Sequence, residues 1–258
     1  LESAAKSIEQ SYIKIGAQNM CWEDEGQFTG EISPLMLKEL GINLVMIGHS
    51  ERRHVLGETD SDENKKVKAA LNHGFTTLLC IGETAGEKDF GISTEVLRTQ
   101  LKIGFHDVPA SQTKNIWVAY EPVWSIGVNG TPASADYAES MHKEIKKALL
   151  EIFGDAGKDI PVLYGGSVNP GNADELIIQP SIDGLFTGRA AWQADKFNIY
   201  VIVIDCFYFP KKAPEIFLVG PLRFELRTSA MSRRRHNRLD HEPYNAYCFR
   251  FSHGSATP

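Results

Sequence analysis

Apolar runs and helical patterns alternate along the chain between residues 12 and 188. Six apolar, β-branched runs are nearly continuous, without the alternation of hydrophobic and polar positions that a half-exposed sheet shows. Such runs are typical of parallel strands that are covered on both faces. They predict strands at residues 12–17, 43–48, 76–82, 116–121, 162–166 and 183–188.

Helix patterns fill the spaces between these strands. Ser33 precedes a segment that stops at Gly41, and two longer segments end at Gly74 and Gly154, as helices commonly do. The predicted helices span residues 33–41, 61–74, 133–154 and 169–178, and residues 86–95 are interpreted as a solvated helix start. Repeated strand–helix units predict an α/β fold with a parallel sheet.

Composition limits the class of protein. The chain has 258 residues, 42% of them hydrophobic, enough for one large domain or two small ones. Its four cysteines are widely spaced, which favours a reducing, cytoplasmic setting over a disulfide framework. No signal peptide is recognised, and the apolar stretch at 198–209 is too short and interrupted to span a bilayer, so we expect no membrane association.

Charge is divided unevenly along the chain. The net charge is −6, but residues 221–258 hold seven of the eleven arginines, no lysine and three acids, so this tail is +4 and the rest is −10. An arginine-rich arm for an anionic partner is one interpretation. We favour an unstructured extension, and we expect no nucleic-acid binding. The predicted boundary divides a domain at 1–204 from a disordered extension at 205–258.

Residues that could react with or bind a ligand follow the predicted strands. His49, Glu83, Glu121, Ser167 and Gly188 each come at the carboxyl end of a different strand. The carboxyl ends of parallel strands meet at one rim, and in barrels that rim carries catalysis. We therefore expect these residues to lie around one site.

His49 and Glu121 form the predicted acid–base pair. An unpaired carboxylate is costly at the end of a buried strand, so Glu121 is interpreted as a general base. His49 precedes a short helix, whose dipole disfavours the protonated imidazole and leaves a neutral hydrogen-bond donor. Taken singly, such a histidine is more often a helix cap, and such a glutamate can be a salt-bridged strand end.

Two glycine-rich turns predict an anion site. Residues 164–172 and 184–192 each pass from a strand directly into a helix, where backbone N–H groups and the helix dipole attract a phosphate. Residues 122–134 are interpreted as a hinged lid that brings the N–H of Gly127 to the same phosphate. Taken singly, these glycines are equally consistent with tight turns that bind nothing.

The sequence resembles the triosephosphate isomerase family over roughly residues 12–204. The motifs GAQNM, FTGEIS, GHSERR, CIGE, AYEPVWSIG, YGGSV and a final GR turn occur in the family's order and spacing. The resemblance implies a (β/α)8 TIM barrel and an isomerase that interconverts glyceraldehyde 3-phosphate and dihydroxyacetone phosphate, without cofactor or metal. The TGRAAW and VNGTPAS segments look closer to the erythrulose-phosphate isomerases, so a four-carbon substrate is the alternative.

The resemblance also implies residue roles. A glutamate base and a neutral histidine are this family's known pair; Glu121 would move a proton between adjacent carbons through an enediol(ate), and His49 would polarise the carbonyl. Glu51 and Cys80 would support them, and substrate contacts would come from Gly127, Gly165, Gly166, Ser167, Gly188 and Arg189. Residues 16–31 correspond to a loop that would form a homodimer through Thr29. The implied setting is glycolysis and gluconeogenesis in the cytoplasm.

One departure from the family affects the whole fold. The family has two further strand–helix units before the strand at Tyr12, and the first carries an Asn and a Lys that contact substrate. We therefore expect an incomplete barrel whose sheet has two unpaired edges, in a fragment or in a chain that another chain completes. An inactive, phosphate-binding remnant is the alternative of another class.

Overall fold

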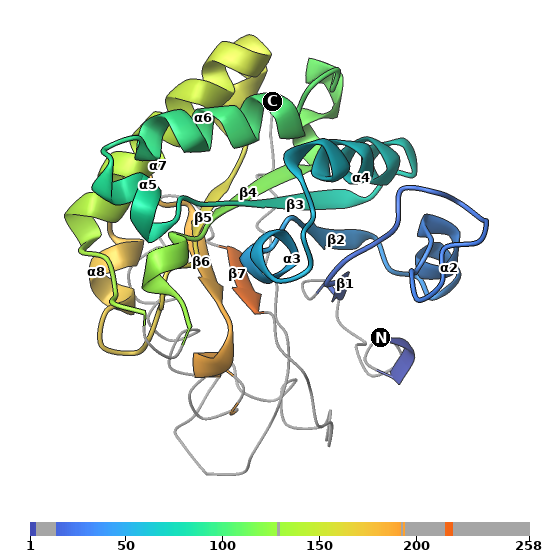
Figure 1. Cartoon of the computed structure of the whole chain (residues 1–258), viewed down its shortest axis with the longest axis horizontal. Helices are drawn as coiled ribbons and strands as arrows, with labels where there is room; N and C mark the ends of the chain where they lie inside the picture. Colours follow the sequence, from blue (N-terminus) through green and yellow to red (C-terminus); the bar gives the residue numbers. More distant parts are fainter. Residues whose placement is uncertain (4–13, 128–129, 192, 194–214, 219–258) are drawn as a thin grey trace, which may run out of the picture.

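The described residues form a parallel sheet that curls into part of a barrel, with helices along its outer side (Figure 1). The computed structural model describes residues 1–3, 14–127, 130–191, 193 and 215–218. Its strands follow one another in chain order, and each neighbouring pair is parallel. The strands are β1 (Gly16–Ala17), β2 (Leu44–Ile47), β3 (Thr76–Ile81), β4 (Ile116–Tyr120), β5 (Val162–Tyr164), β6 (Gly184–Thr187) and β7 (Glu215–Leu218).

The six predicted strands are confirmed, and with them the partial barrel of β/α units. Their bounds differ by a few residues. The largest difference is in the first strand, where only Gly16 and Ala17 pair with β2, whereas residues 12 and 13 lie outside the described part.

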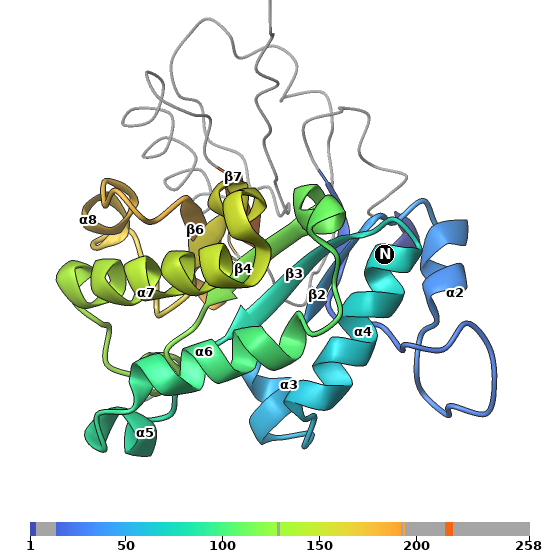
Figure 2. The same cartoon turned by 90° about the horizontal axis from the view of Figure 1, so that it is seen from above.

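Three longer helices cover the outer face of the sheet, as Figure 2 shows from above. They are α4 (Asp60–Asn72), α6 (Ser93–Gly104) and α7 (Ala135–Phe153). The shorter helices are α2 (Pro34–Glu39), α3 (Ser50–His54), α5 (Ala85–Asp89) and α8 (Ala173–Ile177), and the 3-10 segments are η1 (Ala110–Asn115), η2 (Val123–Ser125), η3 (Gly154–Asp159) and η4 (Arg189–Ala191). Every predicted helix is therefore present, although the fourth is shorter than expected.

The segment predicted as one helix start is two helices, so that prediction was wrong in extent. A capping box between Thr84 and Glu87 begins α5, and Gly91, with a φ of 73°, ends it in a left-handed turn. The following helix α6 begins at Ser93 with no side-chain cap on its N-cap residue, Ile92. It is held by buried Leu97 and Leu101, so packing replaces the missing start signal.

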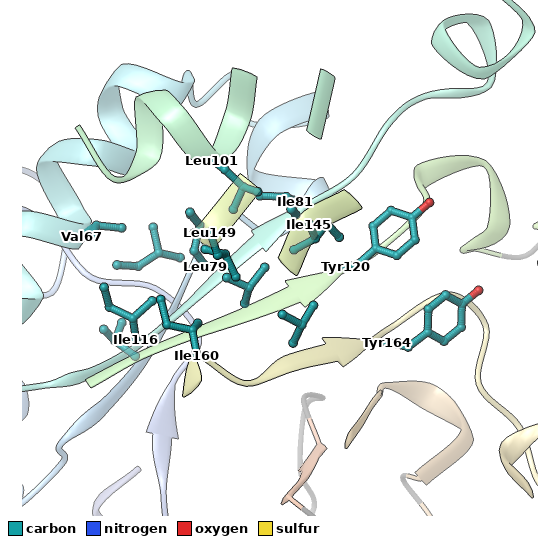
Figure 3. Packing of buried hydrophobic residues seen from close by; sticks show 14 of the residues in the cluster. Val67, Leu79, Ile81, Leu101, Ile116, Tyr120, Ile145, Leu149, Ile160 and Tyr164 are labelled. Atoms are coloured by element: carbon teal, nitrogen blue, oxygen red, sulfur yellow. The ribbon is translucent and has the colours of Figure 1, made fainter. Parts of the chain in front are cut away.

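The core has two layers, one on each face of the sheet. The outer layer fills the space between the strands and α4, α6 and α7, where Val67, Leu101, Ile145 and Leu149 meet the sheet (Figure 3). The inner layer lies on the opposite face and consists of Leu44, Met46, Leu78, Cys80, Trp117, Ala119, Leu163 and Phe186. Burial on both faces explains why the strands are nearly continuous apolar runs.

One edge of the six-strand sheet is paired, which corrects the prediction of two free edges. Strand β7 aligns parallel to β6, from Gly184 opposite Glu215 to Thr187 opposite Leu218. A free strand edge offers unpaired N–H and C=O groups, and the backbone of β7 pairs with those of β6. The unstructured extension at 205–258 stays a prediction. The rest of 205–258 and the family's last helix near 193–204 lie outside the described residues, apart from Gln193.

In the described part of the chain, no helix combines the length and apolar character needed to cross a bilayer.

Candidate active site

His49 is positioned by the turn between β2 and α3. Gly48 has a φ of 75°, a conformation that costs glycine little, so the chain turns sharply at the strand end. His49 is then the N-cap of α3, and its Nδ1 accepts a hydrogen bond from the Glu51 N–H at 3.3 Å. Because Nδ1 uses its lone pair here, the proton of a neutral His49 ring lies on Nε2.

Glu121 follows β4 and is only 4% exposed. Its backbone N–H donates to the Ile81 carbonyl at 2.8 Å, which continues the pairing with β3. Two glycines leave room for it: a Cβ on Gly82 would lie 1.9 Å from the Glu121 carbonyl oxygen, and one on Gly165 would lie 2.9 Å from its Cγ. Gly165, predicted to contact substrate, is therefore also needed for the packing of Glu121.

The His49 and Glu121 side chains converge at the carboxyl rim of the sheet. Nε2 of His49 lies 3.2 Å from Oε1 of Glu121. Burial lowers the pKa of His49, but the charge and hydrogen bond of Glu121, with the charge of Glu51, outweigh burial and raise this pKa above 6.5. The direction is opposite to the one predicted from the helix dipole, because the Glu121 carboxylate in contact with the ring favours the protonated imidazole. The buried Oε2 of Glu121 has no N–H or O–H donor among the described residues.

A cavity of about 920 Å³ lies over this pair. Its wall brings together the acid–base pair and five of the residues predicted to bind substrate, namely Gly127, Gly165, Ser167, Gly188 and Arg189. Ser167 has a φ of 50°, which is strained for a residue with a side chain, and its Oγ donates to the Ser125 carbonyl. The guanidinium of Arg189 forms no ion pair with a described residue.

Of three other predicted residues, Glu51 lines the cavity, whereas Gly166 and Cys80 do not. Gly166 is behind its wall, where a Cβ would lie 2.3 Å from Tyr164 Oη and 2.5 Å from Ser125 Oγ. Cys80 is buried in the inner layer; burial, with the neighbouring charge of Glu121, raises the pKa of its thiol well above 9.0. Glu51 is at the outer rim, with its side chain 80% exposed.

The base of the predicted lid is anchored by residues that the sequence did not reveal as a group. The buried Glu83 accepts hydrogen bonds from Trp124 Nε1 at 2.7 Å, Tyr137 Oη at 2.9 Å and Tyr120 Oη at 3.1 Å. Lys88 lies over the Trp124 ring, 3.5 Å from its centroid. The CIGE motif contains Glu83 and the AYEPVWSIG motif contains Tyr120 and Trp124, but neither motif indicated that these side chains meet. Residues 128–129 of the lid lie outside the described part.

Further polar residues of the cavity wall are Gln18, Asn19 and Arg52. The Asn19 amide oxygen accepts from Lys66 at 2.8 Å, and Lys66 and Arg52 both contact the Glu58 carboxylate. Gln18 and Asn19 belong to the GAQNM motif, but their spacing from the other residues gave neither one a role in the sequence analysis.

A parallel half-barrel with a histidine and a glutamate converging at its carboxyl rim is the arrangement of an aldose–ketose isomerase. Comparison with known sequences agrees with this class: the sequence model of triosephosphate isomerase matches residues 1–203. The chain belongs to the triosephosphate isomerase family.

Similar curated proteins are named L-erythrulose-1-phosphate isomerase. The protein of Rhizobium etli is 52% identical over 74% of this chain and 70% of the relative. The protein of Mesorhizobium japonicum is 49% identical over 74% of this chain and 75% of the relative, and that of Brucella abortus is 48% identical over 72% of each.

Proposed function

We propose that the protein is an isomerase of a four-carbon ketose phosphate, with L-erythrulose 1-phosphate as substrate. The observation that carries this proposal is the 3.2 Å approach of His49 Nε2 and Glu121 Oε1 inside a cavity that also holds the predicted phosphate-binding residues. The names of the relatives support the four-carbon substrate, which was the alternative to the triose phosphate in the sequence analysis.

In the proposed reaction, Glu121 removes a proton from the carbon next to the substrate carbonyl. His49 donates from Nε2 to the carbonyl oxygen, because its Nδ1 is already occupied by the Glu51 N–H. An enediol(ate) forms; Glu121 then returns its proton to the former carbonyl carbon while His49 takes the hydroxyl proton from the neighbouring carbon's oxygen, so that the carbonyl moves by one carbon and both side chains are restored. The substrate carbons take the place of the direct contact between the two side chains, which leaves both groups facing the same reacting atoms.

The phosphate is proposed to lie where Gly127, Ser167, Gly188 and Arg189 line the cavity. Glycine N–H groups can approach an anion closely, and an arginine guanidinium forms paired hydrogen bonds with phosphate oxygens. Arg189 would therefore supply positive charge that the neighbouring glycine turns lack. The reaction as proposed uses no cofactor and no metal.

Assays of the purified chain on two substrates test the proposal. We expect turnover of L-erythrulose 1-phosphate with a kcat/KM roughly 10- to 200-fold above that for glyceraldehyde 3-phosphate, since one carbon in a pocket is worth about that factor. A preference for glyceraldehyde 3-phosphate would instead favour triosephosphate isomerase activity. Tight binding of a phosphorylated enediolate mimic without any turnover would instead favour the inactive remnant.

We also propose that the chain assembles as a homodimer through residues 16–31. Thr29 is exposed, and so are the neighbouring apolar side chains Phe28, Ile32, Leu35 and Met36, each at least 43%. Exposed apolar side chains that lie close together are typical of a protein interface. The cytoplasmic setting and a place in glycolysis remain predictions.

A further inference from the structure

Arg53 is a buried arginine whose guanidinium makes hydrogen bonds to two backbone carbonyls of the active-site strands. Its side chain is 8% exposed, although it belongs to the short surface helix α3. Nε donates to the Gly48 carbonyl at 2.7 Å, and Nη2 donates to the Cys80 carbonyl at 3.1 Å. Nη1 pairs with Asp60, the first residue of α4, which balances the buried charge.

Both carbonyls belong to segments that place the proposed acid–base pair. Gly48 is bonded directly to His49. Cys80 is in β3, the strand that separates the β2 end bearing His49 from the β4 end bearing Glu121, and it pairs in register with Ala119. The guanidinium thus links the turn that carries the imidazole to the strand between the two groups, and Asp60 holds this link from α4.

Gly48 is shaped to receive this guanidinium. A Cβ at Gly48 would lie 2.8 Å from Nη2 of Arg53 and 3.2 Å from the Cys80 carbonyl oxygen. Its φ of 75° also disfavours any residue with a side chain. The glycine and the arginine therefore form one unit, in which the glycine leaves the space that the arginine fills.

The arrangement requires arginine rather than a positive charge in general. A guanidinium presents several N–H donors in a fixed plane, so it can satisfy two carbonyls and one carboxylate at the same time. A lysine ammonium is a single point on a flexible chain, and it cannot hold Gly48, Cys80 and Asp60 in this geometry.

We propose that Arg53 is a positioning residue of the isomerase: by holding the Gly48 and Cys80 carbonyls, it fixes the His49 ring against Glu121. The inference rests on the proposed function of this pair. Arg53 does not line the cavity and touches no substrate, so its effect is on the geometry of the reacting groups.

The test compares Arg53→Lys with Arg98→Lys in the whole chain, on the sugar phosphate that the wild type turns over. Arg98 pairs with Glu151 on the outer helices, so its replacement is a matched control that we expect to leave kcat unchanged. For Arg53→Lys we expect kcat to fall about 10- to 100-fold with KM within about threefold, because misplacement by an ångström costs such factors. Gly48→Ala should give the same pattern, since its added methyl displaces the guanidinium.

Nitrogen NMR of the His49 ring provides a second readout that does not depend on turnover. The wild type should show the tautomer with its proton on Nε2, and Arg53→Lys should show a mixture of tautomers with a His49 pKa closer to 6.5. If the wild type turns over neither sugar phosphate, the proposed function fails, and these spectra still decide the role of Arg53. Unchanged kcat and unchanged His49 spectra in folded Arg53→Lys would overturn the inference.

Discussion

Two buried glutamates follow neighbouring strands, and their surroundings distinguish Glu83 from Glu121, the proposed base. Glu83 accepts from two tyrosine hydroxyls and one indole N–H, so its charge is well satisfied. One oxygen of Glu121 lies 3.2 Å from the His49 ring, and its other oxygen has no N–H or O–H donor among the described residues. A carboxylate left so poorly satisfied is suited to accept a proton from a ligand.

Arg189 is the residue at which phosphate binding can be tested separately from chemistry. Replacement by methionine keeps the bulk and removes the charge, so we expect KM to rise about 10- to 100-fold, the equivalent of one lost charge-assisted hydrogen bond of 1.5–3 kcal/mol. Steady-state kinetics measure this, and kcat should change much less than KM. Arg189→Lys should recover part of the lost affinity. If Arg189→Met has the same KM as the wild type, Arg189 does not bind the phosphate.

At the scale of helices, α4 carries a buried carboxylate that makes the fold sensitive to pH. Burial raises the pKa of Glu63 from 4.5 to about 7, and its neighbour Glu58 adds to the effect. Between pH 4.5 and about pH 7, Glu63 keeps its proton in the folded chain and has released it in the unfolded chain. Folding stability therefore falls as the pH rises from about 4.5 to 7, by at most roughly 3 kcal/mol.

Glu63→Gln removes this dependence because the amide remains neutral. Compared with the wild type, the variant should unfold at a higher urea concentration at pH 8 and at nearly the same concentration at pH 5. Urea titrations at the two pH values measure the difference. If the two proteins lose stability equally between pH 5 and pH 8, Glu63 does not titrate as described.

The hydrogen bond that anchors the base of the predicted lid can be removed while an aromatic side chain is kept at position 124. Trp124→Phe deletes the hydrogen bond to Glu83, worth about 1.5–3 kcal/mol for a charged acceptor. We expect a less stable closed lid, a lower kcat and more inorganic phosphate released per turnover, because water then reaches the enediol(ate). A phosphate assay run beside the isomerase assay measures the ratio, and no increase in it would mean that Trp124 does not hold the lid.

Helix starts could be predicted from the sequence where a capping residue marks them. Contacts between residues far apart in the chain could not. Thr59 and Ser134 cap α4 and α7, and these starts could be read within a residue or two. The start of α6 could not, because Ile92 makes no cap hydrogen bond. The predicted lowering of the His49 pKa was also wrong. This pKa is raised by Glu121, which is 72 residues away in sequence but lies 3.2 Å from the ring.

At the scale of the whole molecule, motifs in a fixed order identified the rim of the barrel before any contact was known. His49, Glu121 and Ser167 come from three strand ends, and one cavity joins them. Arg53 could not be predicted in its role, because its two carbonyl partners are recognised only in three dimensions. Strand β7 was not predicted because it has only three apolar residues, after Glu215, which are too few to stand out from the tail around it.

Assembly is the prediction that belongs to this scale. Thr29→Arg places a charge among the exposed Phe28 and Ile32, so we expect the sedimentation coefficient to fall from that of a dimer to that of a monomer. Lys114→Arg, on the segment η1, is a control that keeps the charge unchanged. A wild type that sediments as a monomer, or a Thr29→Arg variant that remains dimeric, would contradict the proposed interface.

Hydrogen exchange at carbon tests the central claim most directly. L-erythrulose 1-phosphate is incubated in D2O with wild-type protein or with Glu121→Gln. Proton NMR follows the hydrogen on the hydroxyl-bearing carbon beside the carbonyl. We expect the wild type to introduce deuterium there, and Glu121→Gln, folded to the same extent, to lose nearly all of this exchange. Equal deuterium incorporation by the two proteins would contradict the assignment of Glu121 as the base.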